Sequence, residues 1–93
     1  MSERLIYSAR HTGRLVTGEV SDVAEFDLRI YDDGRLRRGE GTVYASPTAI
    51  ETAFRSGSSK IEWGAKWANV IVTSWSGGSD RAAFKMSGGI QET

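Results

Sequence analysis

Apolar and polar residues alternate strictly over residues 23–31, and this is the clearest structural pattern in the chain. The apolar positions are Ala24, Phe26, Leu28 and Ile30. A period of two places these side chains on one face of a β-strand and the polar ones on the other face. We therefore predict an antiparallel sheet with one buried face and one solvated face.

The turn after this strand is predicted at Asp32-Asp33-Gly34, because glycine accepts the positive φ that tight hairpin turns require. The return strand is expected over residues 35–45. Leu36 is out of phase with Val43, and one extra residue in the strand would restore the alternation. We therefore expect a β-bulge near Arg38-Gly39.

Shorter alternating segments predict further hairpins on both sides of this one. Turns are expected at His11-Thr12-Gly13 and at Gly64-Ala65. Glycine at the first position of the second pair fits a type II′ turn. The strands that flank these turns, together with a last strand near the C-terminus, are expected at 4–10, 14–20, 60–63, 66–75 and 81–87.

Residues 47–56 are the segment in which we expect a helix. Ser46 suits the N-cap, Pro47 suits the first helical position, and Gly57 can end the helix in the left-handed conformation. The apolar side chains on one face are those of Ile50, Ala53 and Phe54. Ten residues are only marginally stable as an isolated helix, so we expect this one to dock on the sheet.

The order of elements is thus about four strands, one helix and three strands. It predicts a mainly β (α+β) fold, an antiparallel meander of about seven short strands with one short helix at about 47–56. The meander would form either a twisted sheet or a small barrel. We expect a single domain over 1–93 with a frayed tail at 88–93. An edge strand left open, at 4–10 or 81–87, would favour a homodimer through sheet extension.

Composition and charge restrict the classes of function. The 93 residues include 12 Lys plus Arg and 12 Asp plus Glu, so the formal net charge is zero. A neutral chain does not favour duplex DNA or an anionic membrane as a partner. The absence of cysteine excludes disulfides and cysteine-ligated zinc. Without a signal peptide or an apolar run of membrane-spanning length, we expect a cytoplasmic protein with no membrane contact.

No recognised catalytic or nucleotide-binding motif occurs in the sequence. His11 is the single histidine, and at a predicted turn we expect it to be exposed and without an orienting acid. Asp32 and Asp33 carry oxygen ligands for a cation, but Asp-Asp-Gly is also ordinary turn chemistry. We therefore expect no catalytic residue, no metal site and no cofactor.

Arginines gather around the predicted 23–45 hairpin and form a first candidate binding group. Its members are Arg29, Arg35, Arg37 and Arg38. Strand pairing would bring these side chains together. Acidic residues on the same strands would neutralise them in a structural charge ladder, or the arginine forks would recognise phosphate or the acidic side chains of a partner.

The tryptophans Trp63, Trp67 and Trp75 form a second candidate binding group. Trp67 and Trp75 are eight residues apart, so they share one face of the predicted strand. An exposed set of indole rings would stack on bases or anchor a protein partner. In the alternative arrangement, Trp63 and Trp67 cover one end of a barrel and Trp75 packs under the helix.

Two functions from different classes follow from these observations. The first hypothesis is a non-catalytic protein-interaction module, of the adaptor or inhibitor type, whose partner is another protein. The alternative is a small barrel that binds single-stranded nucleic acid through aromatic and Arg/Lys side chains, although the neutral net charge argues against it. An enzyme is disfavoured, because one histidine and no cysteine leave few ways to build a nucleophile–base pair.

Overall fold

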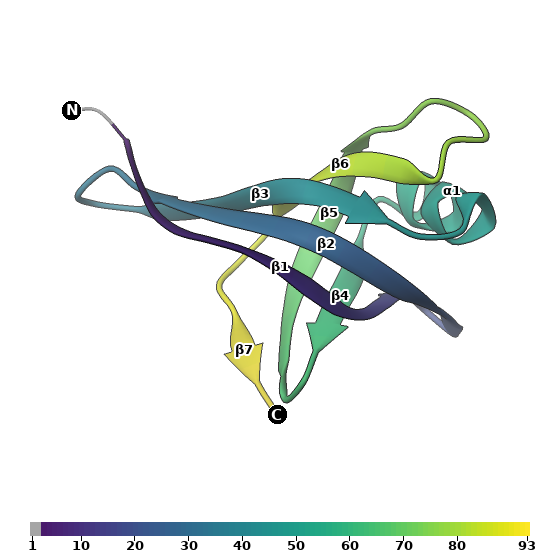
Figure 1. The fold of residues 1–93 in the computed structure, drawn as a ribbon, viewed down its shortest axis with the longest axis horizontal. Coiled ribbons are helices and arrows are strands. Elements are labelled where there is room, and N and C mark those ends of the chain that lie inside the picture. The colour runs from purple at the N-terminus through teal and green to yellow at the C-terminus, as the bar shows by residue number, and fades with distance from the viewer. Residues whose placement is uncertain (1–2) are drawn as a thin grey trace.

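Residues 3–93 form seven strands and one helix (Figure 1). The structure is a computed structural model that describes these residues, so the first two residues of the domain expected over 1–93 lie outside the described part. The elements are β1 (Arg4–Thr17), β2 (Val20–Asp32), β3 (Arg37–Tyr44), α1 (Pro47–Ser56), β4 (Ser59–Trp63), β5 (Lys66–Ser74), β6 (Arg81–Met86) and β7 (Gln91–Glu92).

Six strands close into a small barrel, which confirms the mainly β fold and selects the barrel over the open twisted sheet. β1, β2 and β3 form one antiparallel meander, and β4, β5 and β6 form a second one. Two antiparallel seams join the meanders, β1 with β4 and β3 with β6. β7 pairs with β5 outside the closed ring.

Three strands precede the helix, where four were expected, because β1 runs unbroken through the predicted turn at His11-Thr12-Gly13. The chain reverses instead at Gly18-Glu19, where Gly18 has a φ of +58°. Gly13 lies within β1 and does not form a turn. A Cβ at this position would overlap the carbonyl oxygen of Glu62, so the missing side chain allows β4 to approach β1. This glycine marks a close approach of two strands, not a turn.

The β-bulge lies on a different strand from the one expected. β2 and β3 pair without a shift over their whole contact, so there is no bulge near Arg38-Gly39. Leu36 is out of phase because it belongs to the turn, where it is 76% exposed. Register shifts occur instead in β1 between Leu5 and Tyr7, opposite the end of β2, and in β5 between Val72 and Ser74, opposite β6. The expected turn at Gly64-Ala65 is confirmed, with Gly64 at a φ of +58°.

The helix is confirmed at its predicted bounds. Ser46 Oγ accepts a hydrogen bond from the Ala49 amide at 3.2 Å, Pro47 occupies the first turn, and Gly57 ends the helix at a φ of +81°. Helix α1 packs against β1, β2, β5 and β6 at one end of the barrel (Figure 1). Ile50 is fully buried there. Local capping and tertiary packing therefore stabilise the same ten residues.

The C-terminal residues, where the sequence predicts a frayed tail, follow β5 in an ordered path. Gln91 pairs with Trp67 and Glu92 pairs with Lys66 in β7. The Thr93 amide donates a hydrogen bond to the carbonyl oxygen of Ala65 at 2.8 Å. Because Ile90 packs against the core, the segment after β6 covers part of the barrel.

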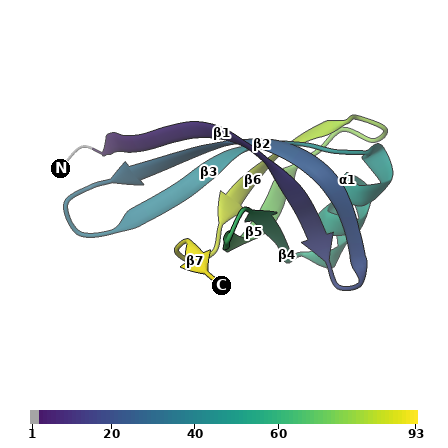
Figure 2. The same cartoon turned by 60° about the horizontal axis from the view of Figure 1, so that its bottom comes forward.

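The first meander is longer than the barrel. β4 pairs with β1 only at residues 14–16, and β6 pairs with β3 only at residues 40–44. The remaining parts of β1, β2 and β3 continue beyond the ring as a three-stranded arm, which extends to the left in Figures 1 and 2. We call this part, residues 4–12, 25–32 and 37–39, the arm. It ends at the turn between β2 and β3.

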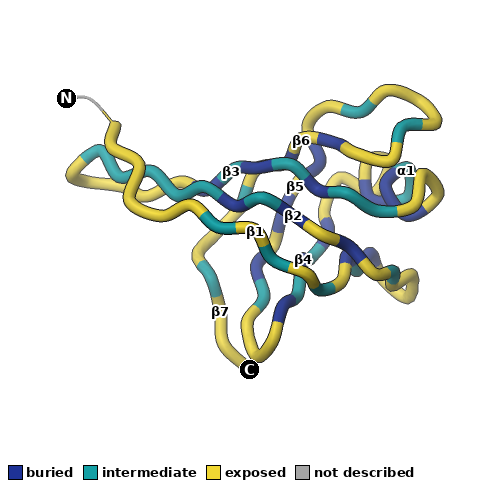
Figure 3. Tube along the Cα trace, in the orientation of Figure 1, coloured by how far each residue is buried: buried dark blue, intermediate teal, exposed yellow. Residues whose placement is uncertain are grey.

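The barrel interior is filled with side chains from both meanders. Figure 3 shows the buried positions concentrated where the meanders face each other, while much of the arm is exposed. The largest fully buried side chains are those of Phe26, Phe84, Leu15, Leu28, Ile50 and Ile61. Free surfaces for a ligand or partner are therefore found on the arm. Among residues 3–93, the single helix is too short and too polar to cross a membrane.

We predict that Gly13→Ala destabilises the protein by about 1–3 kcal/mol, because the added methyl forces β4 away from β1 and opens one seam of the barrel. Urea unfolding followed by tryptophan fluorescence measures the change. Gly77→Ala is the matched control, since a Cβ at Gly77 meets no atom within 4 Å, and we expect it to change the free energy of unfolding by less than about 0.5 kcal/mol. Equal stability of the two variants would contradict the role assigned to Gly13.

Candidate binding site

The three tryptophans lie in three separate environments. Trp63 is buried in the barrel, 5.2 Å from the ring of His11 and edge-on to Phe26 at 5.3 Å. Trp67 is half-buried on the outer face of β5, with Lys60 Nζ 5.2 Å from its ring centre. Trp75 is half-buried against the helix. The three rings form no common platform, and a binding role for any of them stays a prediction.

The position of Trp75 matches the packing alternative considered for it. Its ring lies 5.9 Å from that of Phe54, which belongs to α1. Its Nε1 donates a hydrogen bond to the carbonyl oxygen of Ser79 at 2.9 Å. The indole therefore connects the β5–β6 loop to α1, and these contacts leave the side chain only partly exposed to solvent.

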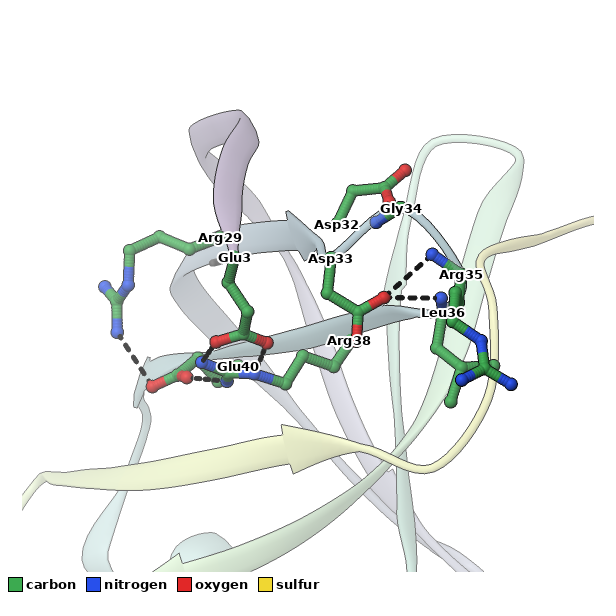
Figure 4. A network of polar contacts seen from close by, with 9 residues as sticks. All are labelled: Glu3, Arg29, Asp32, Asp33, Gly34, Arg35, Leu36, Arg38 and Glu40. Carbon is green, nitrogen blue, oxygen red and sulfur yellow. Dashed lines mark hydrogen bonds and ion pairs between the residues drawn. The ribbon is translucent and has the colours of Figure 1, made fainter. Parts of the chain in front are cut away.

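Three of the four candidate arginines pair with carboxylates, and Figure 4 shows two of them, Arg29 and Arg38. Arg29 lies 3.9 Å from Glu40, and Arg37 lies 3.2 Å from Asp32. Arg38 donates to Glu3 at 2.7 Å and also to Glu40. In the part of the chain that the structure describes, the side chain of Arg35 has no carboxylate within 4 Å. Arg29 and Arg38 thus form the expected charge ladder with Glu40 and Glu3 along the outer face of the sheet, whereas the Arg37–Asp32 pair lies on the inner face.

The acidic turn is satisfied by its own backbone. Asp33 accepts hydrogen bonds from the amides of Arg35 and Leu36, both at 2.8 Å, and Asp32 accepts one from Gly34 at 2.6 Å (Figure 4). The Leu36 and Arg35 amides lower the pKa of Asp33 below its usual value. Within residues 3–93 no group of three or more metal-ligating side chains is assembled. These carboxylates stabilise the turn by accepting hydrogen bonds from its backbone amides.

The outer backbone edge of β1 is open over residues 4–12. A two-residue hairpin loop makes Thr17 and Val20 a hydrogen-bonded pair, and such pairs alternate along an antiparallel ladder. Counting back from this pair, Ser8, Arg10 and Thr12 direct their N–H and C=O groups away from β2. No strand of the described chain lies beside them, because β4 pairs only with residues 14–16.

The side chains along this edge are apolar or basic. Leu5, Ile6 and Tyr7 are 49%, 39% and 38% exposed. Acidic residues are absent from 4–14, whereas the basic residues there are Arg4, Arg10, His11 and Arg14. Arg10 forms an ion pair with Glu25 at 3.1 Å and lies 3.8 Å from Asp27. Within residues 3–93, Arg4 and Arg14 have no carboxylate within 4 Å, and only the longer-range charges of Asp32 and Asp22 act on them, so the positive charge of this edge is only partly compensated.

His11 lies beside this edge on the inner face of β1, where its ring stacks on Trp63. Its Nε2 lies 2.7 Å from Tyr7 Oη, so the two side chains share a hydrogen bond. Partial burial lowers the pKa of His11, and the charge of Lys66 lowers it further. His11 is therefore not the exposed turn residue that the sequence predicts, since it belongs to an aromatic stack inside a strand.

A groove of about 570 Å³ lies on the inner face of the arm. The segment that connects β6 to β7 forms its opposite wall. Arg37 and Arg38, two of the candidate arginines, lie at this groove, whereas Arg29, Arg35 and the tryptophans do not line it. The apolar lining consists of Ile6, Tyr7, Ile30, Met86 and Ile90. The open edge and the groove share Ile6 and Tyr7, so they form one continuous candidate region.

Most of this region differs from what the sequence pattern predicts. The pattern predicts two strands over 4–10 and 14–20, whereas β1 is one strand with a long open edge. One signal was available: Gly18-Glu19 has the same pattern, glycine followed by one other residue, as Gly64-Ala65. A turn there makes residues 4–17 one strand. The groove had no local signal, because its walls come from opposite ends of the chain.

Comparisons with protein-family models, with curated proteins and with solved structures find no match for this chain.

We predict that the free energy of unfolding falls between pH 7 and pH 5.5 because of His11. Its pKa is lower in the folded protein than in the unfolded chain, so the unfolded chain binds more protons as the pH falls through its ordinary pKa. The stabilisation is complete above that pKa and is lost as the pH drops towards the folded value.

Urea unfolding at a series of pH values measures this effect. His11→Gln is the control, because glutamine does not titrate and the chain has no other histidine. We expect the pH slope of the variant to be nearly flat in this window. Identical slopes for the two proteins would show that His11 does not titrate differently on folding.

Proposed function

We propose that this protein is a non-catalytic protein-interaction module that binds an extended segment of a partner protein at the open edge of β1. The single observation that carries the proposal is the mismatch between β1 and its neighbour. β1 has 14 residues, but β4 covers only three of them on this side. Strand addition would satisfy the free backbone groups of Ser8, Arg10 and Thr12.

The side chains beside the edge favour a particular partner chemistry. On the inner face a new strand would meet Tyr7 and the His11–Trp63 stack, which favours apolar residues. On the outer face it would meet Arg10, with Arg14 just beyond the open stretch where β4 begins to pair, and these guanidinium groups favour acidic residues. We therefore propose a partner segment in which apolar and acidic residues alternate, in keeping with the two faces of a strand.

A second copy of this chain is a less favourable occupant. Antiparallel pairing of β1 with another β1 centred on Arg10 would place the two Arg10 side chains opposite each other, and residues 4–14 of either copy contain no acid that would attract the arginines of the other copy. Like charges opposite each other destabilise a sheet. The expected second open edge, over 81–87, is wrong, because β6 pairs with β3 on one side and with β5 on the other.

Nucleic acid is also a less favourable partner. Single-stranded binding needs exposed rings along a basic track, whereas Trp63 is 8% exposed and the ladder arginines Arg29 and Arg38 are paired with carboxylates. The neutral net charge gives no long-range attraction. These observations support the protein partner over the nucleic-acid alternative.

The proposal predicts binding of a nine-residue peptide that alternates valine with glutamate. Fluorescence anisotropy measures its affinity, and ¹⁵N NMR should place the largest amide shifts at Ser8, Arg10 and Thr12. A peptide that alternates valine with lysine is the charge control, and we expect it to bind at least about tenfold more weakly. Equal binding of both peptides, or shifts confined to other strands, would contradict the proposal.

Ser8→Pro tests the backbone contribution. Proline removes the one N–H that Ser8 directs to the open edge and leaves the bonds between β1 and β2 intact. We expect affinity for the glutamate peptide to fall about fivefold, as for the loss of about 1 kcal/mol. Ser8→Ala, which keeps the N–H, should bind like the unchanged protein. Sedimentation of the unchanged protein as a stable dimer that Ser8→Pro dissociates would instead identify a second copy as the occupant.

A further inference from the structure

The groove on the inner face of the arm has the features of a small-molecule site in its own right. Its volume of about 570 Å³ falls within the range of roughly 300–1,000 Å³ found for such sites. Ile6, Tyr7 and Ile30 come from the arm, and Met86 and Ile90 come from the segment around β6 and β7. The arm thus supplies one apolar wall and the C-terminal segment supplies the other.

Glycines explain why this space remains open. Gly39 lies on the inner face of β3, and a Cβ there would overlap Met86 Sδ, so the wall is formed by the flexible methionine. Gly88 and Gly89 line the opposite side, and a Cβ at either of them would meet no atom within 4 Å. Neither has a positive φ. The wall there lacks side chains although the backbone would accept them.

One guanidinium faces the groove with donors to spare. Arg37 shares the inner face of β3 with Gly39, two residues away, and its side chain is 72% exposed. Its one ion pair, at 3.2 Å to Asp32, is an exposed contact of the kind that contributes little. Arg38, on the opposite face, is held by Glu3 and Glu40. Arg37 is therefore the cation available to a ligand.

We infer that this groove binds a single-chain fatty carboxylate, with the alkyl chain between the two apolar walls and the carboxylate on Arg37. The walls are aliphatic apart from Tyr7, which suits a flexible alkyl chain. The fork of the guanidinium matches a carboxylate. This inference does not use the backbone N–H groups of the β1 edge, which the ligand leaves free, although Ile6 and Tyr7 border both the groove and the open edge.

Isothermal titration calorimetry with octanoate, decanoate and dodecanoate, each below its micelle concentration, tests the apolar part. We expect affinity to rise about threefold to fourfold per methylene while the chain remains inside the groove. Decyltrimethylammonium has the same chain with the opposite charge, and we expect it to bind at least about tenfold more weakly than decanoate.

Two variants, Gly89→Leu and Arg37→Gln, test whether decanoate binds in the groove. Gly89→Leu fills the groove from the wall that has room for a side chain, and we expect it to reduce decanoate affinity at least about tenfold. Gly77→Leu is the matched control, because Gly77 also has space and no positive φ but lies in the β5–β6 loop. It should bind decanoate like the unchanged protein. Arg37→Gln, at an exposed side chain, should cost about fivefold to tenfold.

Three results would overturn the inference. Undiminished decanoate binding by Gly89→Leu and Arg37→Gln together would place the ligand elsewhere. Equal affinity for decanoate and decyltrimethylammonium would remove the role of the guanidinium. No binding of any of the three carboxylates would show that the groove does not hold a fatty carboxylate. Decanoate binding is measured without the glutamate peptide, so failure of the strand-addition proposal leaves this result readable.

Discussion

The difference in length between β1 and β4 is the constraint on which the other features of the molecule depend. β1 has 14 residues and β4 has five, and the two strands pair only at residues 14–16 of β1. A barrel closes by matching strands around a ring. The ring therefore ends where β4 turns away, and what remains of β1 continues without a neighbour. The arm, the open edge and the groove all begin at this point.

An aromatic stack stabilises the point at which the two strands separate. Trp63 is the last residue of β4, and it packs on His11 and Phe26 from the first meander. Aromatic pairs of this kind contribute about 0.5–1.5 kcal/mol beyond the area that they bury. Gly13 is needed beside them because the backbone of β4 passes too close for a side chain. Packing and backbone approach thus act together where hydrogen bonding between the strands stops.

Electrostatics divide the arm into two faces. On the outer face, paired arginines and carboxylates neutralise one another across three strands, and each exposed pair contributes little to stability. On the inner face, glycines and aliphatic side chains leave a groove, with Arg37 as its accessible charge. The neutral composition of the whole chain therefore conceals a local imbalance at the edge of β1, where arginines have no acidic neighbours in sequence.

Sequence reasoning succeeded where the determining signals are local. Ser46, Pro47 and Gly57 specify the helix ends within a few residues, and the alternation over 23–31 identifies β2. The prediction at Gly13 was wrong because a glycine can allow either a turn or the close approach of another strand. At Gly13 the approaching strand is β4, more than 40 residues away in the sequence. Barrel closure follows from such non-local pairing, which no local pattern contains.

In the candidate site, too, the features that depend on neighbouring residues could be predicted from the sequence, and those that depend on distant segments could not. The arginine cluster and its ladder were predictable from alternation on two adjacent strands. The groove was not, because Ile6 and Ile90 meet only after the whole chain has folded. His11 was misplaced as a consequence of dividing β1. Its surroundings depend on Trp63 and Lys66, which no spacing in the sequence connects to it.

Amide hydrogen exchange along β1, measured residue by residue by NMR, tests the open edge most directly. The account predicts fast exchange at Ser8, Arg10 and Thr12 and slow exchange at Ala9 and His11, whose amides bond to β2. At Arg14 and Val16, where β4 begins to pair, protection should appear on the outward side as well. Uniform protection from residue 8 to residue 16 would mean that the edge is already covered, and would contradict the account.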